Sequence, residues 1–272
     1  MPQPDAYPAP LIRALLGFLV ASAIALGARR AGALSTSGAL AAAGIGTVCV
    51  AAGTGWGVLL IAYFVGASLL TRHGRQEKER RTEGVVAKAG ARDATQVIAN
   101  GGIYAACLVV AAFSPERIAA LVYFAAVGAL AASSADTWAT EIGTLHGGTP
   151  RSLFTFKRVA TGTSGGISLA GSVAMVGGAG LVALIAMLVG LPSGPWAVII
   201  GGSAGAIADS VLGATLQERR WCPNCATASE QLVHSCGIPT ALVGGVSWIN
   251  NDTVNLLSTV VGGVVAACVA SL

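Results

Sequence analysis

The chain has 272 residues, of which 54% are hydrophobic and only 10% are charged. Soluble domains carry about 25% charged residues, so this composition excludes an ordinary soluble domain. The net charge of +4 is too small to indicate a nucleic-acid partner, and we expect none.

Eight apolar blocks run along the chain, most of them near the length of about 20 residues that a transmembrane helix needs. The first block lacks a basic start and a good cleavage site, so we interpret it as a retained span rather than a signal peptide. The blocks are Leu11–Leu26, Ala33–Ala52, Trp56–Leu70, Val97–Phe113, Ile118–Ala135, Gly165–Val189, Trp196–Leu216 and Thr253–Leu272. They predict an all-α fold, a polytopic membrane helical bundle of about 7–8 transmembrane helices in a single integral membrane domain over residues 1–272.

Two segments leave the number of spans open. Trp56–Leu70 is short, so it could instead form a re-entrant pair with the block before it. Ile238–Trp248 is too short to cross the hydrocarbon core, and we expect it to dip into the membrane or to lie at the interface.

Alternation of eight spans places the cations on one side of the membrane. One set of loops holds all of the 16 Lys and Arg residues except Arg13 and Arg117. The members of this set are Arg29, Arg30, Arg72, Arg75, Lys78, Arg80, Arg81, Lys88, Arg92, Arg151, Lys157, Arg158, Arg219 and Arg220. The positive-inside rule then predicts a multi-pass protein of the cell membrane with both termini outside and cytoplasmic loops at about residues 71–95, 136–161 and 217–252.

Four acidic residues stand out because they lie inside or at the ends of apolar blocks. Asp209 is within a block, whereas Asp136, Glu141 and Asp252 lie where spans meet the predicted cytoplasmic face. A lone carboxylate in lipid is costly, so such residues normally face a bundle interior, a cation or a partner. The topology brings the three aspartates to one depth, and we assign catalytic roles to all four acidic residues.

Each of the three aspartates is followed by Ser or Thr, and helical spacing extends each pair into a polar stripe. Ser133 and Thr140 share a face with Asp136. The stripes of the later spans are formed by Ser210, Gly213 and Gln217, and by Asn251, Asn255 and Ser258. Helix–helix hydrogen bonding is the alternative explanation for single hydroxyls. Carboxylates beside hydroxyls are hard oxygen ligands, so we predict that Asp136, Asp209 and Asp252 bind Mg²⁺ next to substrate phosphates.

A Gly-rich turn at the predicted start of the sixth span suggests an anion site. It contains Gly162, Thr163, Gly165 and Gly166, and Lys157 and Arg158 precede it. A helix N-terminus with free N–H groups attracts phosphate, and the two cations add charge. The alternative is a small-residue packing helix.

Four residues in the loop after Arg220 have the spacing of a zinc site. Cys222, Cys225, His234 and Cys236 form a C-x2-C-x8-H-x-C pattern, which suits tetrahedral Zn²⁺ with a structural role. Free thiols or a redox pair are the alternative.

The basic loop before the fourth span ends in a polar face. Arg92, Gln96 and Asn100 follow one another at four-residue spacing, and we expect them to face substrate at the mouth of the bundle. The rest of the loop is explained by topology and by contact with anionic lipid.

These motifs together resemble one integral membrane family, first catalogued as of unknown function, which includes the plant phytyl-phosphate kinase of tocopherol synthesis. The resemblance runs in order from about Gly38 to the C-terminus. It is carried by Gln96…Asn100-Gly-Gly, Ser134-Ala-Asp136-Thr-Trp-Ala-Thr-Glu141-Ile-Gly, Gly162-Thr-Ser-Gly-Gly, Asp209-Ser…Gly213-Ala-Thr-Leu-Gln217 and Asn250-Asn-Asp252-Thr-Val-Asn255. The family is distantly similar to CTP-dependent phytol and dolichol kinases and to phosphatidate cytidylyltransferase.

The resemblance implies a Mg²⁺-dependent kinase that transfers a phosphoryl group from a nucleoside triphosphate, CTP above all, to a prenyl monophosphate such as phytyl phosphate. The partners implied are therefore the nucleotide, the prenyl phosphate and membrane lipid. Two alternatives remain. One is a cytidylyltransferase that makes a CDP-lipid from the same reactants, and the other is a transporter or flippase of phosphorylated lipid.

Overall fold

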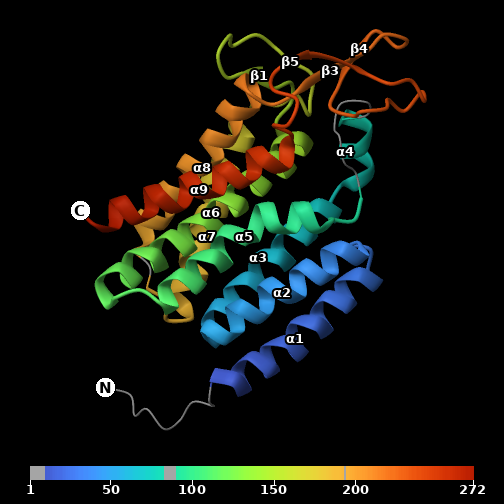
Figure 1. Cartoon of the computed structure of the whole chain (residues 1–272). Coiled ribbons are helices and arrows are strands. Elements are labelled where there is room, and N and C mark those ends of the chain that lie inside the picture. The colour runs from blue at the N-terminus through green and yellow to red at the C-terminus, as the bar shows by residue number, and fades with distance from the viewer. Residues whose placement is uncertain (1–9, 83–89, 193) are drawn as a thin grey trace.

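The structure, a computed structural model, describes residues 10–82, 90–192 and 194–272. Helices dominate this part of the chain (Figure 1). The longer ones are α1 (Pro10–Arg30), α2 (Thr36–Ala52), α3 (Thr54–Arg72), α5 (Ala94–Ala112), α6 (Glu116–His146), α7 (Leu169–Leu188), α8 (Pro195–Thr215) and α9 (Asn251–Ala270), and α4 (Arg75–Thr82) is short.

Each of the eight predicted apolar blocks forms one of the longer helices, so the helical membrane bundle is confirmed. Seven of the helices are long and apolar enough to cross a membrane, and α2, with 17 residues, is shorter. The turn between α2 and α3 is Gly53 alone, at φ 153°, a conformation that residues with a side chain rarely adopt. Since α3 has 19 residues and the hydropathy of a span, it does not need α2 to complete a crossing.

Helix α6 lies at the centre of the bundle, against α5, α7, α8 and α9. Its middle turns, from Ala126 to Ala135, are buried throughout and consist mostly of the small residues Ala, Gly and Ser. Small residues let the neighbouring backbones approach closely. A Cβ added at Gly205 of α8 would lie 2.4 Å from Ala132 Cβ of α6 and 2.8 Å from the Ser258 carbonyl oxygen of α9. This close packing joins the three helices that carry the predicted aspartates.

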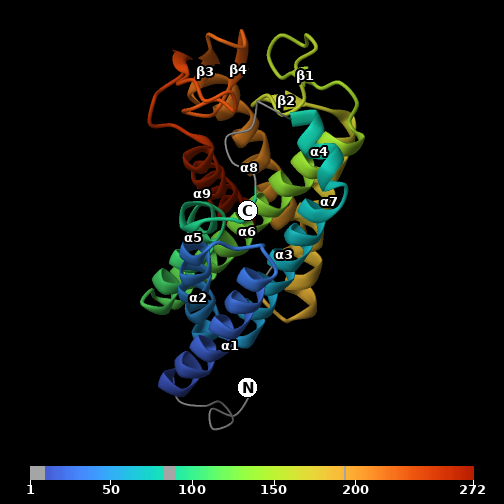
Figure 2. The same ribbon diagram turned by 90° about the vertical axis from the view of Figure 1, so that its right-hand side faces the viewer.

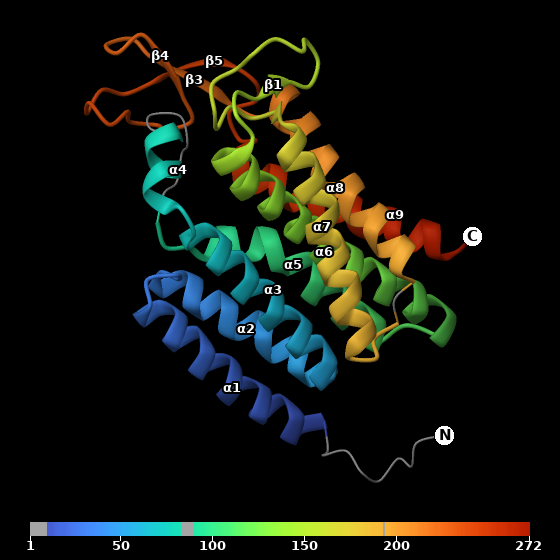
Figure 3. The same cartoon turned by 180° about the vertical axis from the view of Figure 1, so that it is seen from behind.

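Helices α1 and α2 form an outer layer. Figure 3 shows them on one side of α5, with α6 to α9 on the other, whereas α3 packs against α2, α6 and α7. Helix α1 packs mainly against α2, and its outer face is exposed. Two backbone hydrogen bonds tie the loop before α2 to the loop before α5, namely Ser35 N–H to Arg92 O and Arg92 N–H to Ala33 O, both 3.0 Å.

The non-helical segments gather at one end of the bundle, which we call the polar end (Figures 1 and 2). Strand β1 (Arg151–Ser152) pairs with β2 (Gly166–Ile167). Strand β3 (Arg219–Cys222) lies between β4 (Thr227–Ser229) and β5 (Ala241–Gly244), and all these pairs are antiparallel. The expectation that Ile238–Trp248 dips into the membrane is therefore corrected, because its centre is β5, which is paired with β3. The alternative, that the segment lies at the membrane interface, stays a prediction.

Two predicted boundaries also change. Helix α6 continues past Ala135 to His146, so the first part of the predicted 136–161 loop is helical. At 1.5 Å per residue its 31 residues extend about 46 Å, longer than the hydrocarbon core of about 30 Å. The predicted loop at 71–95 contains α4, and Lys88 lies outside the described residues.

The start of α1 and the end of α9 both lie away from the polar end, as the alternation of spans predicts.

Candidate functional site

A cavity of about 840 Å³ opens at the polar end of the bundle. Its walls come from α5, α6, α7, α8 and α9, and from the segments around residues 161–168 and 230–233. Of the residues predicted for the site, those that line it are Arg92, Gln96, Asn100, Asp136, Glu141, Gly162, Thr163, Gly165, Gly166, Asp209, Ser210, Asn251, Asp252 and Asn255. Residues far apart in the sequence thus share one cavity.

The three aspartates reach the cavity from three helices: Asp136 from α6, Asp209 from α8 and Asp252 from α9. Asp252 accepts a hydrogen bond from the Thr95 hydroxyl, 3.0 Å away. The Oδ2 atom of Asp209 is buried and has no hydrogen-bond partner among the described residues. Buried polar atoms are nearly always satisfied, so this oxygen is suited to accept a ligand.

The aspartates do not converge on one point. Within the described chain, the one group of three or more His, Cys, Asp or Glu ligand atoms lying within 4.8 Å of one another is the Cys/His set discussed below. Three carboxylates binding one Mg²⁺ directly at 2.0–2.1 Å would have their oxygens within about 4.2 Å of one another. The residues fit the commoner arrangement, in which one or two carboxylates hold Mg²⁺ together with substrate phosphates and water.

Arg92, Gln96 and Asn100 face the cavity together, as the four-residue spacing predicts. Asp93 caps α5 in a capping box, in which its carboxylate accepts from Gln96 N–H and the Gln96 side chain accepts from Asp93 N–H. The Asn100 side-chain amide donates to the Gln96 carbonyl oxygen, at 2.8 Å. Arg92 donates to Thr71 Oγ1, at 3.2 Å. The cap therefore fixes the first turn of α5, so that its polar side chains face the cavity.

Glu141 lines the cavity but is held by an ion pair. Its Oε2 lies 2.5 Å from Lys78 Nζ of α4, and its Oε1 accepts from the Thr71 hydroxyl, at 2.6 Å. The Lys78 ammonium also donates to the carbonyl oxygens of Leu70 and Thr71, at the C-terminal end of α3. Glu141 thus connects α6 to α3 and α4. The catalytic role assigned to it stays a prediction.

Glu230 is a wall residue that sequence reasoning missed. Its Oε1 accepts from Ser164 Oγ, at 2.5 Å, and from Gln217 Nε2, at 2.9 Å. Gln217 is buried and lies behind this wall rather than in it. The one signal for this wall was Gln217, the last residue of the predicted polar stripe, which lies two residues beyond the end of α8. Glu230 itself lies in a polar loop with no distinctive pattern.

The Gly-rich segment does not open a helix, which corrects its predicted position. Helix α7 begins at Leu169, capped by Ser168, whose hydroxyl accepts from Gly171 N–H. Gly165 has φ 77°, and a Cβ there would lie 2.4 Å from Ala214 Cβ, so packing and conformation require glycine at this position. The segment still forms one wall of the cavity.

Lys157 and Arg158 lie outside the cavity lining, on the exposed turn between β1 and β2. Arg158 pairs with Arg151 in an isolated bridge of the backbone. The phosphate role predicted for these two cations therefore remains a prediction that no contact with the cavity supports. Arg92 is the one Lys or Arg among the described lining residues.

Three helices begin at the cavity. The first turns of α5, α7 and α9 contribute Gln96, Gly171 and Asp252 to the lining, and each helix is capped by a side chain, from Asp93, Ser168 and Asn250 respectively. The positive ends of three helix dipoles therefore point at one space, an arrangement that favours anionic ligands.

A second, smaller cavity of about 90 Å³ adjoins the first and is almost entirely apolar. Residues of α1, α2, α3 and α5 form it, among them Ile24, Ile45 and Phe64. Arg92, Gln96 and Asn100 line both cavities. The polar face of α5 is thus the boundary between a charged space and an apolar one.

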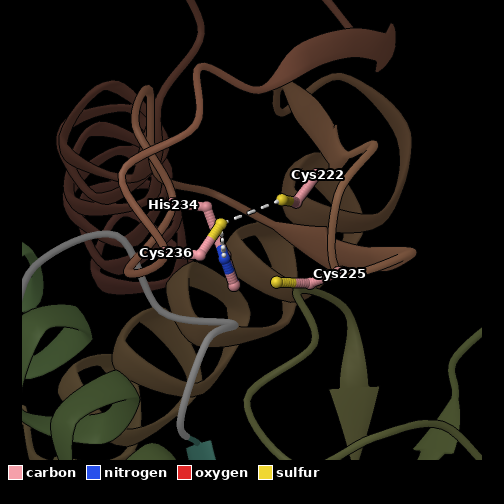
Figure 4. Close-up of side chains that lie close together, drawn as sticks. All are labelled: Cys222, Cys225, His234 and Cys236. Atoms are coloured by element: carbon pink, nitrogen blue, oxygen red, sulfur yellow. Dashed lines mark hydrogen bonds between the residues drawn. The ribbon is translucent and has the colours of Figure 1, made fainter.

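Figure 4 shows the four residues of the predicted zinc site gathered at the edge of the three-stranded sheet. Their ligand atoms all lie within 4.8 Å of one another. A hydrogen bond with His234 lowers the pKa of the Cys236 thiol to about 6, whereas hydrogen bonding to Cys236 raises the pKa of Cys225 to about 11. The His234 contact thus favours the thiolate form of Cys236, which is the form that binds metals.

Comparison with known proteins places this architecture. The family model described as integral membrane protein DUF92 matches residues 19–263. Protein PGR of Arabidopsis thaliana is 30% identical over 92% of this chain and 93% of its own length. An uncharacterised membrane protein of Methanocaldococcus jannaschii is 27% identical over 95% of each chain. The chloroplastic protein VTE6 of Arabidopsis thaliana is 28% identical over 86% of this chain and 64% of its own length. No solved structure matches. The family resemblance of the motifs is confirmed, and the chain belongs to the DUF92 family of integral membrane proteins.

Proposed function

We propose that this protein is a membrane-embedded prenyl-phosphate kinase, which transfers a phosphoryl group from a nucleoside triphosphate to a prenyl monophosphate. The observation that carries the proposal is the pair of adjoining cavities, one charged and one apolar, that share Arg92, Gln96 and Asn100. An amphipathic phosphate fits such a pair, because its head needs polar partners and its tail needs an apolar surface. The choice of CTP and of phytyl phosphate rests on the motif resemblance.

The charge of the large cavity supports a requirement for metal. Its described lining contains six carboxylates, those of Asp136, Glu141, Asp209, Glu218, Glu230 and Asp252, and one guanidinium, that of Arg92. Lys78 pairs with Glu141, and Arg220 pairs with Glu218 at 3.0 Å. Asp136 and Asp209 have no ion pair among the described residues, so two carboxylates of the spanning helices face one guanidinium. Two phosphate substrates would be repelled there unless cations were bound with them. Mg²⁺ held by one or two of the aspartates would supply that charge neutralisation.

The proposed reaction balances without an external base. A terminal oxygen of the prenyl monophosphate attacks the γ-phosphorus, and the bond from that phosphorus to the bridging β–γ oxygen breaks. The products are the prenyl diphosphate and the nucleoside diphosphate, and the attacking oxygen already carries negative charge. Phosphoryl transfer of this kind needs mainly positioning and charge stabilisation. Arg92 would orient the prenyl phosphate by a charge-assisted, bidentate contact.

The apolar cavity would take the part of the prenyl chain nearest the phosphate. At about 90 Å³ it is too small for a long chain, so the remainder would lie in lipid along the exposed face of α1. The asymmetry of the Lys and Arg residues supports a cytoplasmic polar end in the cell membrane, where soluble nucleotide would reach the large cavity directly.

The first experiment uses the full chain purified in detergent, with labelled CTP, Mg²⁺ and phytyl or geranylgeranyl phosphate. We expect CDP and the prenyl diphosphate. Asp209→Asn should lower turnover at least about a hundredfold, on the scale of losing one preorganised electrostatic group. Pyrophosphate and a CDP-lipid in place of CDP would identify a cytidylyltransferase. Absence of both products with these and the other nucleoside triphosphates would overturn the kinase proposal.

A second experiment tests the apolar cavity. Ile24→Trp would fill it from α1 and should raise KM for geranylgeranyl phosphate about tenfold or more, with a smaller effect on a short prenyl phosphate. The matched control is Leu19→Trp, an exposed position of α1 outside the cavity, which should leave both values unchanged. An equal effect of the two variants would show that the tail binds elsewhere.

A further inference from the structure

We infer that Cys222, Cys225, His234 and Cys236 form a tetrahedral Zn²⁺ site, and that this site holds one wall of the large cavity in place. The Cys222 and Cys236 sulfurs are 3.6 Å apart, and His234 Nδ1 lies 3.3 Å from Cys236 Sγ (Figure 4). Zinc–sulfur bonds of about 2.3 Å and zinc–nitrogen bonds of about 2.0–2.1 Å at tetrahedral angles give separations of about 3.8 and 3.6 Å. The four side chains are therefore close to the required geometry.

Two tight turns present the ligands in pairs. The first lies between β3 and β4, where Cys222 pairs with Thr227 and Cys225 is followed by Ala226. Ala226 has φ 49°, a left-handed conformation that is uncommon for residues other than glycine. Such backbone strain persists only where the surroundings enforce it. A metal bound to the adjacent Cys225 would supply that constraint.

The second turn carries the other pair. His234 N–H donates to Ile238 O at 3.0 Å, and Gly237 N–H donates to His234 O at 2.8 Å. Gly237 has φ 82°, so the chain reverses directly after Cys236. His234 is buried although the loop around it is mostly exposed. The two turns thus bring their ligand atoms within 4.8 Å of one another.

The segment between the two turns is the cavity wall. Glu230, Gln231, Leu232 and Val233 all line the large cavity, and they lie between Cys225 and His234 in the chain. Few large apolar side chains are buried around them, since Leu232 and Val233 are exposed. A small sheet with so little core needs another source of stability, and a structural metal provides one. The wall role rests on the proposed function, whereas the zinc site itself does not.

The zinc content of the protein and the absorption spectrum of its Co²⁺-substituted form test the site independently of enzyme activity. The full chain, purified in detergent without chelator, should contain about one zinc per chain by elemental analysis. Cys222→Ser together with Cys225→Ser should reduce it to below about a tenth, whereas Cys268→Ser, at an exposed cysteine of α9, should retain it. Co²⁺ exchanged into the site should give the visible absorption of a tetrahedral thiolate complex. His234→Cys, which preserves four ligands, should keep the metal that His234→Ala loses.

Other outcomes distinguish failure of the zinc site from failure of the proposed kinase function. A zinc-free chain that also fails to bind added Zn²⁺ under reducing conditions would overturn the site, and so would a Cys222–Cys236 disulfide in the native protein. If zinc is bound but no kinase product forms, the site stands and the proposed function fails. If zinc positions the wall, its removal should increase proteolytic cleavage within residues 217–250 and raise KM for nucleotide severalfold. Unchanged cleavage and KM would leave no role for the metal in the wall.

Discussion

The ion pair between Lys78 and Glu141 offers a direct test of what Glu141 does. The two side chains are 10% and 18% exposed, and the ammonium makes two further hydrogen bonds to the end of α3. Removing one partner of a buried pair leaves an uncompensated charge and costs about 3–5 kcal/mol. For a chain of this size that corresponds to a fall in Tm of roughly 6–20 °C. We therefore expect Lys78→Met and Glu141→Gln each to produce such a fall.

The double variant is the informative one. Replacing both residues with neutral ones leaves no uncompensated buried charge. The fall in Tm of the double variant should therefore be smaller than the sum of the falls caused by the two single substitutions. Glu79→Gln is the matched control on α4, because it breaks the exposed pair with Arg75 and should cost no more than about 1 kcal/mol. Thermal unfolding of detergent-purified protein, at one scan rate, measures all four variants.

Activity of the double variant then decides the role of Glu141. Recovery of turnover together with stability would mean that Glu141 only anchors α6 to α3 and α4. Recovered stability with turnover still reduced about a hundredfold would mean that its carboxylate also acts on the substrates. A Glu141→Gln variant with the parent Tm would refute the reasoning from the buried pair itself.

Two further predictions concern the phosphate contact and the packing of the helices. Arg92→Ala should raise KM for prenyl phosphate at least about tenfold through loss of a charge-assisted contact, and Arg158→Ala should leave it within about twofold; steady-state kinetics would show the opposite order if the exposed turn binds phosphate. Gly205→Val should destabilise the bundle by about 3 kcal/mol or more, because its Cβ would lie 2.4 Å from Ala132 Cβ. Gly180→Ala, with open space around it, is the control, and equal Tm values for the two variants would contradict the close packing of α6, α8 and α9.

The helices and the aspartates could be predicted because each depends on an unmistakable physical signal. A bilayer imposes the length of an apolar span, and a carboxylate such as Asp209 inside one is too costly to occur without a reason. The face formed by Gln96 and Asn100 followed from helical spacing, whereas Arg92 lies before the Asp93 cap of α5 and is held by backbone hydrogen bonds to the loop before α2. These signals are local in sequence, so they needed no knowledge of tertiary contacts.

The parts that escaped prediction depend on contacts between distant segments. The segment Ile238–Trp248 was expected to dip into the membrane or to lie at its interface, because its apolar residues gave no sign that its centre would pair with β3, some twenty residues earlier. Glu230 became a wall residue only through Ser164 and Gln217. Nothing in the sequence distinguished Lys78 from the other cations of its loop, although in the structure its side chain is buried and pairs with Glu141. Pairing of this kind leaves no periodic pattern in one sequence.

The positions of Arg92 and Arg158 show why charge alone is a poor guide to a phosphate site. Both are loop cations on the predicted cytoplasmic face, and Arg158 has the more suggestive neighbours in sequence. Arg92 differs because the capping box of α5 and two backbone hydrogen bonds to the loop before α2 fix its backbone at the junction of the two cavities. In the proposed function, a guanidinium held there contacts the phosphate of a lipid whose chain lies between α1, α2, α3 and α5. Arg158 lines neither cavity, so on this proposal it does not reach that phosphate. The order of the Arg92 and Arg158 effects therefore tests the proposed path of the lipid as well as the identity of the phosphate contact.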